Sequence, residues 1–274
     1  MYENLDKNYY DLTKTTMKIN SVNSGTYFLD LLDNDSINDL NIKGFDAALF
    51  CAAKTNQKEC ENNFEKTHQI NVISTLKLIK KLSKENCSVI FPSTSLVFNG
   101  KRPYPSTQDQ LDPVGNYANF KKEVEEKLLD DNLEKITILR ISKVVDHNFP
   151  LFLEWQKKLL NDEEIQPFND LIFSPISISF LTRVMDQIIK KNISGIFNIS
   201  AQSDISYADA SRYLSKKLGL SLDKIKPVSA KEIFNDIYLP KFAAMNTSSL
   251  DSLGLRAPEP YESIDFFLHS NAEC

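Results

Sequence analysis

Glycine is the residue that this sequence most conspicuously lacks. Only seven glycines occur in 274 residues, which is about a third of the share usual in globular proteins. No two of them lie close enough to form G-x-G. The sequence therefore lacks the glycine-rich turn that places a dinucleotide pyrophosphate at a helix N-terminus.

Other absences narrow the class of protein. Four cysteines and three histidines show no paired metal-ligand spacing, so we expect no metal site and no disulfide framework, and free thiols fit a reducing cytoplasm. The longest apolar stretch, 47–53, is too short to cross a bilayer, and no secretory signal opens the sequence. A net charge of −5 disfavours binding to a phosphate backbone. We expect a cytoplasmic protein without membrane or nucleic-acid partners.

Short apolar runs alternate with helical patterns along the chain. Four runs have the continuous, β-branched character of parallel strands buried on both faces, and two weaker strand candidates precede them. The strong runs are 47–51, 88–92, 136–141 and 195–199, and the weaker ones are 9–13 and 27–31. Helical periodicity marks 60–84, 117–130 and a segment from 178, and Ser206 reads as an N-cap with Asp209 three residues on.

This alternation predicts an α/β fold, a Rossmann-like doubly wound sheet with right-handed crossovers. We expect all six strands to share one mostly parallel sheet. Beyond Ser203 the pattern becomes mainly helical, which predicts a small C-terminal lobe.

Tyr117 and Lys121 stand four residues apart at the start of a predicted helix, so their side chains share one face. Upstream, the strand that begins at 88 runs into Ser93-Thr94-Ser95. These hydroxyls would lie at the carboxyl edge of the sheet, where open α/β sheets bind ligands. The preceding strand ends in the small residues Ala52 and Ala53, where a ligand could approach the backbone closely.

Four ordered motifs resemble those of the extended short-chain dehydrogenase/reductases, most of all the dTDP-4-dehydrorhamnose reductases. They are Cys51-Ala52-Ala53, the segment 68–75, Ser93 to Gly100, and Tyr117-Ala118-Asn119-Phe120-Lys121. Segments 170–175 and 246–250 also resemble parts of that family, and the resemblance extends from Tyr9 to the C-terminus.

The resemblance implies a Thr94, Tyr117 and Lys121 catalytic site. Tyr117 would exchange a proton with the substrate oxygen while hydride passes between a nicotinamide and a sugar carbon. Because a phenol titrates near pH 10, Lys121 would lower its pKa and also hold the nicotinamide ribose, and Thr94 would hydrogen-bond the reacting oxygen. Without that context, Thr94 simply caps a strand end and Lys121 is a solvated lysine.

The resemblance also implies binding residues. Those for the cofactor, NADP or NAD, are Asp30, Leu31, Ala52, Ala53, Lys54 and Lys121. Those for the substrate are Ser95 and Lys143. An equally good interpretation is that Asp30 merely ends a strand. Asn71 matches an asparagine of the family, and we interpret it as structural support.

Departures at the substrate site leave the sugar undefined. Lys143 stands where the family has a tryptophan, and Leu171 where it has a glutamine. Phe180 replaces an aspartate and Leu239 an arginine. At the cofactor side, Lys14 follows the weak strand at 9–13 without an acidic neighbour, which favours a 2′-phosphate and hence NADP.

By the resemblance, residues 1–142 with 177–200 form an N-terminally incomplete dinucleotide-binding domain, and 143–176 with 201–274 form a substrate-binding lobe. The family's first strand, at the centre of its sheet, and its glycine turn have no counterpart. Either the reading frame begins about 20–25 residues upstream, which the retained Thr94, Tyr117 and Lys121 favour, or dinucleotide binding has been abandoned. Without that turn, the chain should bind dinucleotides poorly.

Two functions therefore stay open. The first is an NAD(P)-dependent reductase or epimerase of a nucleotide-activated sugar in polysaccharide synthesis, for which a homodimer is compatible with the sequence. The second is a non-catalytic nucleotide-sugar-binding or regulatory subunit on the same fold, like the regulatory subunit of methionine adenosyltransferase.

Overall fold

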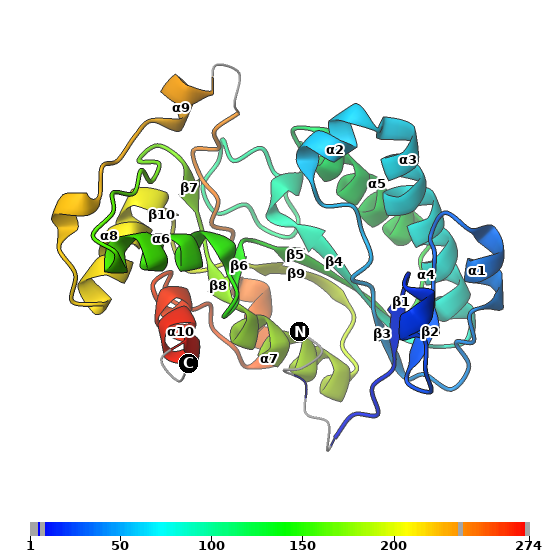
Figure 1. Ribbon diagram of the computed structural model, residues 1–274. Coiled ribbons are helices and arrows are strands. Elements are labelled where there is room, and N and C mark those ends of the chain that lie inside the picture. Colours follow the sequence, from blue (N-terminus) through cyan, green and yellow to red (C-terminus); the bar gives the residue numbers. More distant parts are fainter. Residues whose placement is uncertain (1–4, 6–8, 235–237, 272–274) are drawn as a thin grey trace. The chain divides into compact units, whose positions relative to one another are not determined.

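The computed structural model describes residues 5, 9–234 and 238–271 (Figure 1). The chain divides into two compact units. The first comprises 1–97, 111–140 and 185–197, and the second comprises 98–110, 141–184 and 198–274. No helix within the described ranges is both long enough and apolar enough to span a membrane.

A four-stranded sheet forms the centre of the fold. Its strands are β3 (Ala47–Leu49), β4 (Ser88–Thr94), β5 (Ile136–Ile141) and β9 (Gly195–Ile199), in the order β3-β4-β5-β9. β3 and β4 pair in parallel with Ala48 opposite Val89. A backbone bond from Val89 to Lys135 joins the starts of β4 and β5, and one from Ser142 to Ile199 joins the ends of β5 and β9. All four strands therefore run in one direction. The predicted α/β fold with these four strands in one parallel sheet is confirmed.

The first two strands stand apart from that sheet, so the prediction of a single six-stranded sheet was wrong. β1 (Lys14–Thr16) pairs in parallel with β2 (Thr26–Phe28) as a separate two-stranded sheet. No strand within the described ranges links this pair to β3. The family's central strand, which would do so, has no counterpart in the sequence, and β3 is an edge strand as its absence predicts.

The strand predicted at 9–13 begins instead at Lys14. The two tyrosines before it make side-chain contacts with helix α7 (Ile178–Lys191). The hydroxyl of Tyr10 donates to Asp186 at 2.9 Å, and the ammonium of Lys190 lies 4.7 Å from the ring centroid of Tyr9. The apolar character of this segment therefore reflects helix contacts rather than a strand.

Helix α4 (Thr75–Lys84) and the residue before it bind the segment that follows the small sheet. After β2 comes α1 (Asn34–Asp39), and Lys81 of α4 donates to the carbonyls of Ile37, Asn38 and Leu40 at 3.0, 2.6 and 2.6 Å. A cation at the C-terminal carbonyls of a helix is a favourable arrangement. Ser74 adds a bond from its hydroxyl to the carbonyl of Leu31.

The helix predicted at 60–84 is interrupted. It consists of α2 (Gln57–Asn62), α3 (Phe64–His68), a π-helical segment (Gln69–Ser74) and α4, with the break at Asn63, whose φ and ψ are −130° and 52°. α5 (Asn116–Asp130) agrees with its prediction and buries Phe120, Val124 and Leu128. These side chains share one hydrophobic core with Val89, Phe91 and Ile138 of the sheet.

The second unit is mainly helical, as predicted. Its helices are α6 (Pro150–Leu160), α8 (Tyr207–Lys217), α9 (Ala230–Ile233) and α10 (Glu262–Asn271), and its strands are β6 (Val144–Val145), β7 (Ile172–Phe173), β8 (Ile176–Ser177) and β10 (Ile205–Ser206). β6 pairs with β8 in parallel and β7 with β10 in antiparallel fashion. The predicted cap is present, because the Ser206 hydroxyl accepts the Asp209 N–H at 3.0 Å.

The two units differ from the predicted domain boundaries at residues 98–110, 141–142, 177–184 and 198–200, which fall in the second unit. The binding roles of the two domains stay predictions.

Candidate functional site

Strand β4 ends in hydroxyl groups at the carboxyl edge of the sheet. Thr94 is its last residue and is buried, and the 3-10 turn Ser95–Val97 follows. The Thr94 hydroxyl accepts the N–H of Leu96 at 3.2 Å, which fixes the start of the turn. Thr94 thus combines the predicted capping role with a position at the edge where ligands bind in this class of fold.

Tyr117 lies in the first turn of α5, and that helix starts in an unusual way. Gly115 precedes it with φ +86°, a conformation that favours glycine, and it has no side chain to cap the helix. Instead Glu61, at the end of α2, accepts bonds from the backbone and the side-chain nitrogen of Asn116, both at 2.7 Å. The Glu61 carboxylate therefore fixes the first turn of α5, in which Tyr117 lies.

The phenol of Tyr117 has a raised pKa. Burial, with a smaller contribution from the Cys60 thiol, raises the pKa of Tyr117 to about 12. This direction is opposite to the lowering that the resemblance implies. At neutral pH the phenol is therefore protonated and can donate a proton to a substrate oxygen.

Lys121 explains why the expected lowering is missing. Its ammonium is buried and donates to the carbonyl of Pro92 at 2.6 Å, and it lies 4.4 Å from the centroid of the Phe91 ring. Burial lowers the pKa of Lys121 to about 8, against the opposing effects of the Glu125 carboxylate and then Cys51. The ammonium is thus directed at strand β4, and the alternative of a solvated lysine is wrong.

The three predicted catalytic residues belong to one unit and to two elements in contact. α5 packs against β4 and against the Ser95–Val97 turn, and Lys121 contacts Pro92, two residues before Thr94. The convergence of Thr94, Tyr117 and Lys121 on one reacting atom stays a prediction.

The loop after β3 carries predicted cofactor residues and is held rigidly. Asn71 accepts the N–H of Lys54 at 2.7 Å and donates to its carbonyl at 2.8 Å, so its predicted role as structural support is confirmed. Ala52 is exposed and Ala53 is half-buried. The Lys54 ammonium pairs with Glu59 at 3.1 Å. The loop presents small residues in a fixed backbone conformation, while its lysine charge is partly balanced.

The other predicted cofactor residues lie after β2. Asp30 accepts the N–H of Leu32 at 2.9 Å and its own N–H donates to Ser36 at 2.9 Å. Leu31 is a buried core residue. These bonds account for Asp30 as a turn residue, and its contact with a cofactor stays a prediction, as does that of Leu31.

The predicted substrate residues are found in different units. Ser95 is half-buried at the start of the turn that follows β4. Lys143 is exposed in the second unit, with its ammonium 5.5 Å from the Phe149 ring centroid. Both substrate roles stay predictions.

The described residues offer no cradle for the pyrophosphate of a nicotinamide dinucleotide. Asp46 and Phe50 direct their backbone groups to β4, so by alternation those of Ala47 and Leu49 face the opposite edge, where the described residues place no strand. Gly115 does precede a helix, but the Glu61 carboxylate occupies that helix start. The residues described here offer groups for the nicotinamide end and no cradle for the pyrophosphate.

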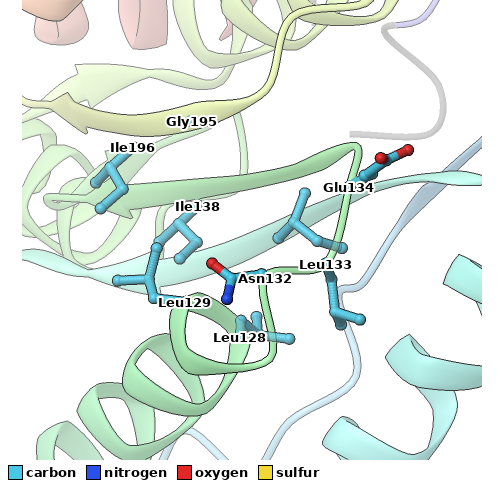
Figure 2. A pocket seen from close by; sticks show the side chains of 9 residues that line it. Leu128, Leu129, Asn132, Leu133, Glu134, Ile138, Gly195 and Ile196 are labelled. Atoms are coloured by element: carbon cyan, nitrogen blue, oxygen red, sulfur yellow. The ribbon is translucent and has the colours of Figure 1, made fainter.

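Figure 2 shows a pocket of about 280 Å³ at the other end of the strands. It lies at the amino ends of β5 and β9, and its lining is mostly apolar, with Asn132 and Glu134 as polar members. None of the candidate catalytic residues lines it. The pocket is therefore separate from the candidate site.

Sequence reasoning missed three charged residues around the site: Glu61, Glu125 and Arg140. A usable signal existed for two of them. Arg140 interrupts the apolar run 136–141, and Glu125 stands one helical turn after Lys121. A charge within a buried pattern indicates a buried partner.

The parallel sheet, its flanking helices and the motif residues on β4 and α5 define a Rossmann-like protein of the extended short-chain dehydrogenase/reductase class. Within that class the chain belongs to the family described as RmlD substrate binding domain, whose sequence profile matches residues 4–268.

Two curated proteins illustrate the range of its relatives. The spore coat polysaccharide biosynthesis protein SpsK of Bacillus subtilis is 25% identical over 231 residues, covering 84% of this chain and 81% of its own. Methionine adenosyltransferase 2 subunit beta of Mus musculus is 22% identical over 255 residues, covering 86% and 73%.

Solved structures share the fold. The dTDP-4-dehydrorhamnose reductase of Bacillus anthracis in complex with NADP has a TM-score of 0.81 at 18% identity, covering 95% of this chain and 99% of its own. MoeE5 in complex with UDP-glucuronic acid and NAD has a TM-score of 0.76 at 16% identity, covering 97% and 92%.

Proposed function

We propose that the protein is a reductase of a nucleotide-activated sugar in polysaccharide synthesis. The observation that carries this is the presence of Thr94, Tyr117 and Lys121 on contacting elements at the carboxyl edge of the sheet, in a chain of the RmlD family. The names of its relatives support the pathway, since SpsK is a spore coat polysaccharide biosynthesis protein and a further relative is the dTDP-4-dehydrorhamnose reductase of Mycolicibacterium smegmatis.

In the proposed reaction a nicotinamide dinucleotide, NADP or NAD, would supply the hydride in its reduced form and become oxidised. Tyr117 donates its proton to the substrate oxygen. With a pKa of about 12 the phenol is protonated at neutral pH, but it is a weaker acid than an ordinary phenol, so the transfer depends on the negative charge that develops on the oxygen as hydride arrives. Thr94 donates a second hydrogen bond to the same oxygen. Lys121 provides positive charge close to the oxygen and to the ribose.

The finer assignments are part of the same proposal. Lys14, exposed in β1, favours NADP over NAD through attraction to a 2′-phosphate. Asp30, Leu31 and the Ala52–Lys54 loop border the dinucleotide, and Ser95 and Lys143 contact the sugar nucleotide.

A second candidate is a non-catalytic regulatory subunit. Two observations favour it: the ammonium of Lys121 is directed at Pro92, and no described residue forms a pyrophosphate cradle. The relationship to methionine adenosyltransferase 2 subunit beta supports it as well.

One assay separates the two functions. The chain is mixed with dTDP-4-dehydrorhamnose and NADPH, and NADPH oxidation is followed at 340 nm, while calorimetry measures binding of each compound. A reductase oxidises NADPH, and Tyr117→Phe loses about 100-fold or more of that rate with unchanged binding. Tyr104→Phe, at an exposed tyrosine, is the matched control and keeps the rate. Sugar-nucleotide binding without oxidation supports the regulatory subunit instead.

A further inference from the structure

The buried carboxylate of Glu125 joins three elements of the first unit. Glu125 lies in the middle of α5 and is fully buried. One of its oxygens accepts bonds from Arg140 Nε at 2.9 Å and Nη2 at 2.8 Å, and the other accepts the hydroxyl of Ser93. Ser93 belongs to β4 and Arg140 to β5. One side chain thus connects the helix that carries Tyr117 and Lys121 with the strand that ends at Thr94.

Two buried cations accompany the Glu125 carboxylate. Lys121 lies one helical turn before it on α5, and Arg140 of β5 pairs with it; both side chains are buried. The partners of Lys121 at β4, the Pro92 carbonyl and the Phe91 ring, carry no formal charge.

Besides burial, the groups that act on the charge of Lys121 are the Glu125 carboxylate and the Cys51 thiol. On its own helix, Glu125 one turn later stabilises the ammonium, and from the end of β3 the Cys51 thiolate would add to that effect. From β5, Arg140 pairs with the same carboxylate, so its positive charge should oppose that effect. Tyr117, one turn earlier on α5, is neutral over the physiological range. Glu125 is the one group among these that is both negatively charged at neutral pH and buried with Lys121.

Stability alone does not account for such a pair. Replacing a buried ion pair by apolar residues of similar volume is often neutral or stabilising, since both charges must be removed from water. Here the Glu125 carboxylate of the pair accepts the hydroxyl of Ser93, the residue before Thr94. It also lies one helical turn from Lys121, so a shift of the pair would reach the candidate site.

We propose that Glu125 is a positioning residue of the candidate active site, which holds Thr94 in place through Ser93 and keeps Lys121 positively charged, while Arg140 limits that charge effect. Its consequence for turnover rests on the proposed function. Its effect on Lys121 does not, and can be measured without substrate.

The test is the pKa of Lys121 by NMR in protein labelled with [ε-13C]lysine, the signal being assigned with Lys121→Met. Glu125→Gln lowers this pKa by about 1 to 3 pH units, as expected for the loss of a close opposite charge. Arg140→Met raises it, because the whole carboxylate then acts on Lys121. Glu126→Gln, at the exposed neighbour that pairs with Lys122, leaves it unchanged. A merely structural role would destabilise both variants without moving the pKa in opposite directions.

The double variant Glu125→Gln/Arg140→Met guards against loss of folding in either single variant. Because both charges are removed together, its Lys121 pKa lies between those of the two single variants. The same Lys121 pKa in the wild type, the double variant and whichever single variant folds overturns the electrostatic part of the proposal.

Ser93→Ala tests the positioning of Thr94. In the NADPH assay with dTDP-4-dehydrorhamnose, kcat falls about tenfold while KM for the sugar nucleotide is unchanged, as expected for a displaced group that acts in the transition state. Wild-type kcat in this variant refutes that part. If the wild type binds both NADPH and the sugar nucleotide by calorimetry yet shows no turnover, the proposed function fails, and the NMR titration still decides the role of Glu125.

Discussion

Glu61 and Asn116 form a two-point contact that starts helix α5. The carboxylate of Glu61 accepts the backbone N–H of Asn116 at one oxygen and its side-chain amide at the other, each at 2.7 Å. Tyr117 is the next residue. The position of the candidate proton donor thus depends on a residue 56 positions earlier in the chain (117 minus 61).

Removing this contact should loosen the helix start. We expect Glu61→Ala to cost about 1 kcal/mol of unfolding free energy, a typical value for a lost helix cap, and to raise amide exchange at Asn116 and Tyr117. Urea unfolding and hydrogen exchange measure these effects. Asn62→Ala, at the exposed next residue, is the control, and equal effects of the two substitutions would refute the role of Glu61.

Stability should depend on pH through Lys121. Because its pKa is about 8 when folded and near 10.4 when unfolded, the unfolded chain binds more protons between these values. Stability therefore rises with pH across this window, by up to about 3 kcal/mol.

Tyr117 acts in the opposite direction at higher pH, since its pKa of about 12 exceeds the unfolded value near 10. The Cys87 thiol, whose pKa burial raises to about 11, also lowers stability as pH rises. Urea unfolding of the wild type and Lys121→Met at pH 7.5, 9 and 10 isolates the lysine, because the other groups are common to both. A constant difference between the two proteins would contradict the prediction.

Lys81 should hold the small N-terminal sheet to the rest of the first unit. Lys81→Met removes three bonds to the end of α1, and we expect a loss of about 1–2 kcal/mol. Hydrogen exchange should accelerate over residues 14–39 and stay unchanged in β4 and β5. Lys84→Met, at the exposed end of α4, should change neither region; uniform acceleration across the sheet would show that Lys81 has no local role.

Asn71 should be required for the loop that follows β3. Asn71→Ala leaves the N–H of Lys54 without its partner and its carbonyl with the weaker Cys60 thiol as donor, which should cost about 1–3 kcal/mol. Asn71→Asp keeps an acceptor for the N–H and should lose less. Thermal unfolding gives the order of the three proteins, and an alanine variant as stable as the aspartate variant would argue against the two-bond clamp.

The sequence was most informative where burial leaves little choice. Strands β5 and β9 match their predicted bounds because each is a short, mostly apolar run. The strand predicted at residues 9–13 was wrong because tyrosines are common in strands but here contact a helix. The break at Asn63 carries no glycine or proline to announce it.

The candidate site was predictable in its residues and not in its electrostatics. The spacing of Tyr117 and Lys121 placed both on α5, but the direction of the Lys121 ammonium depends on Pro92, 29 residues away. The raised pKa of Tyr117 likewise arises from burial by distant segments. Such effects depend on tertiary packing, which spacing along a chain does not encode.

The edge of β3 that has no neighbouring strand among the described residues also bears on how this chain behaves at high concentration. A strand edge with free backbone groups is a template for pairing with another chain. Here the edge is only three residues long and exposes two sets of backbone groups, so a strand added there gains few bonds and self-association through it should be weak and reversible. Dilution should therefore dissolve aggregates that form by this route, unlike the long ladders of cross-β fibrils.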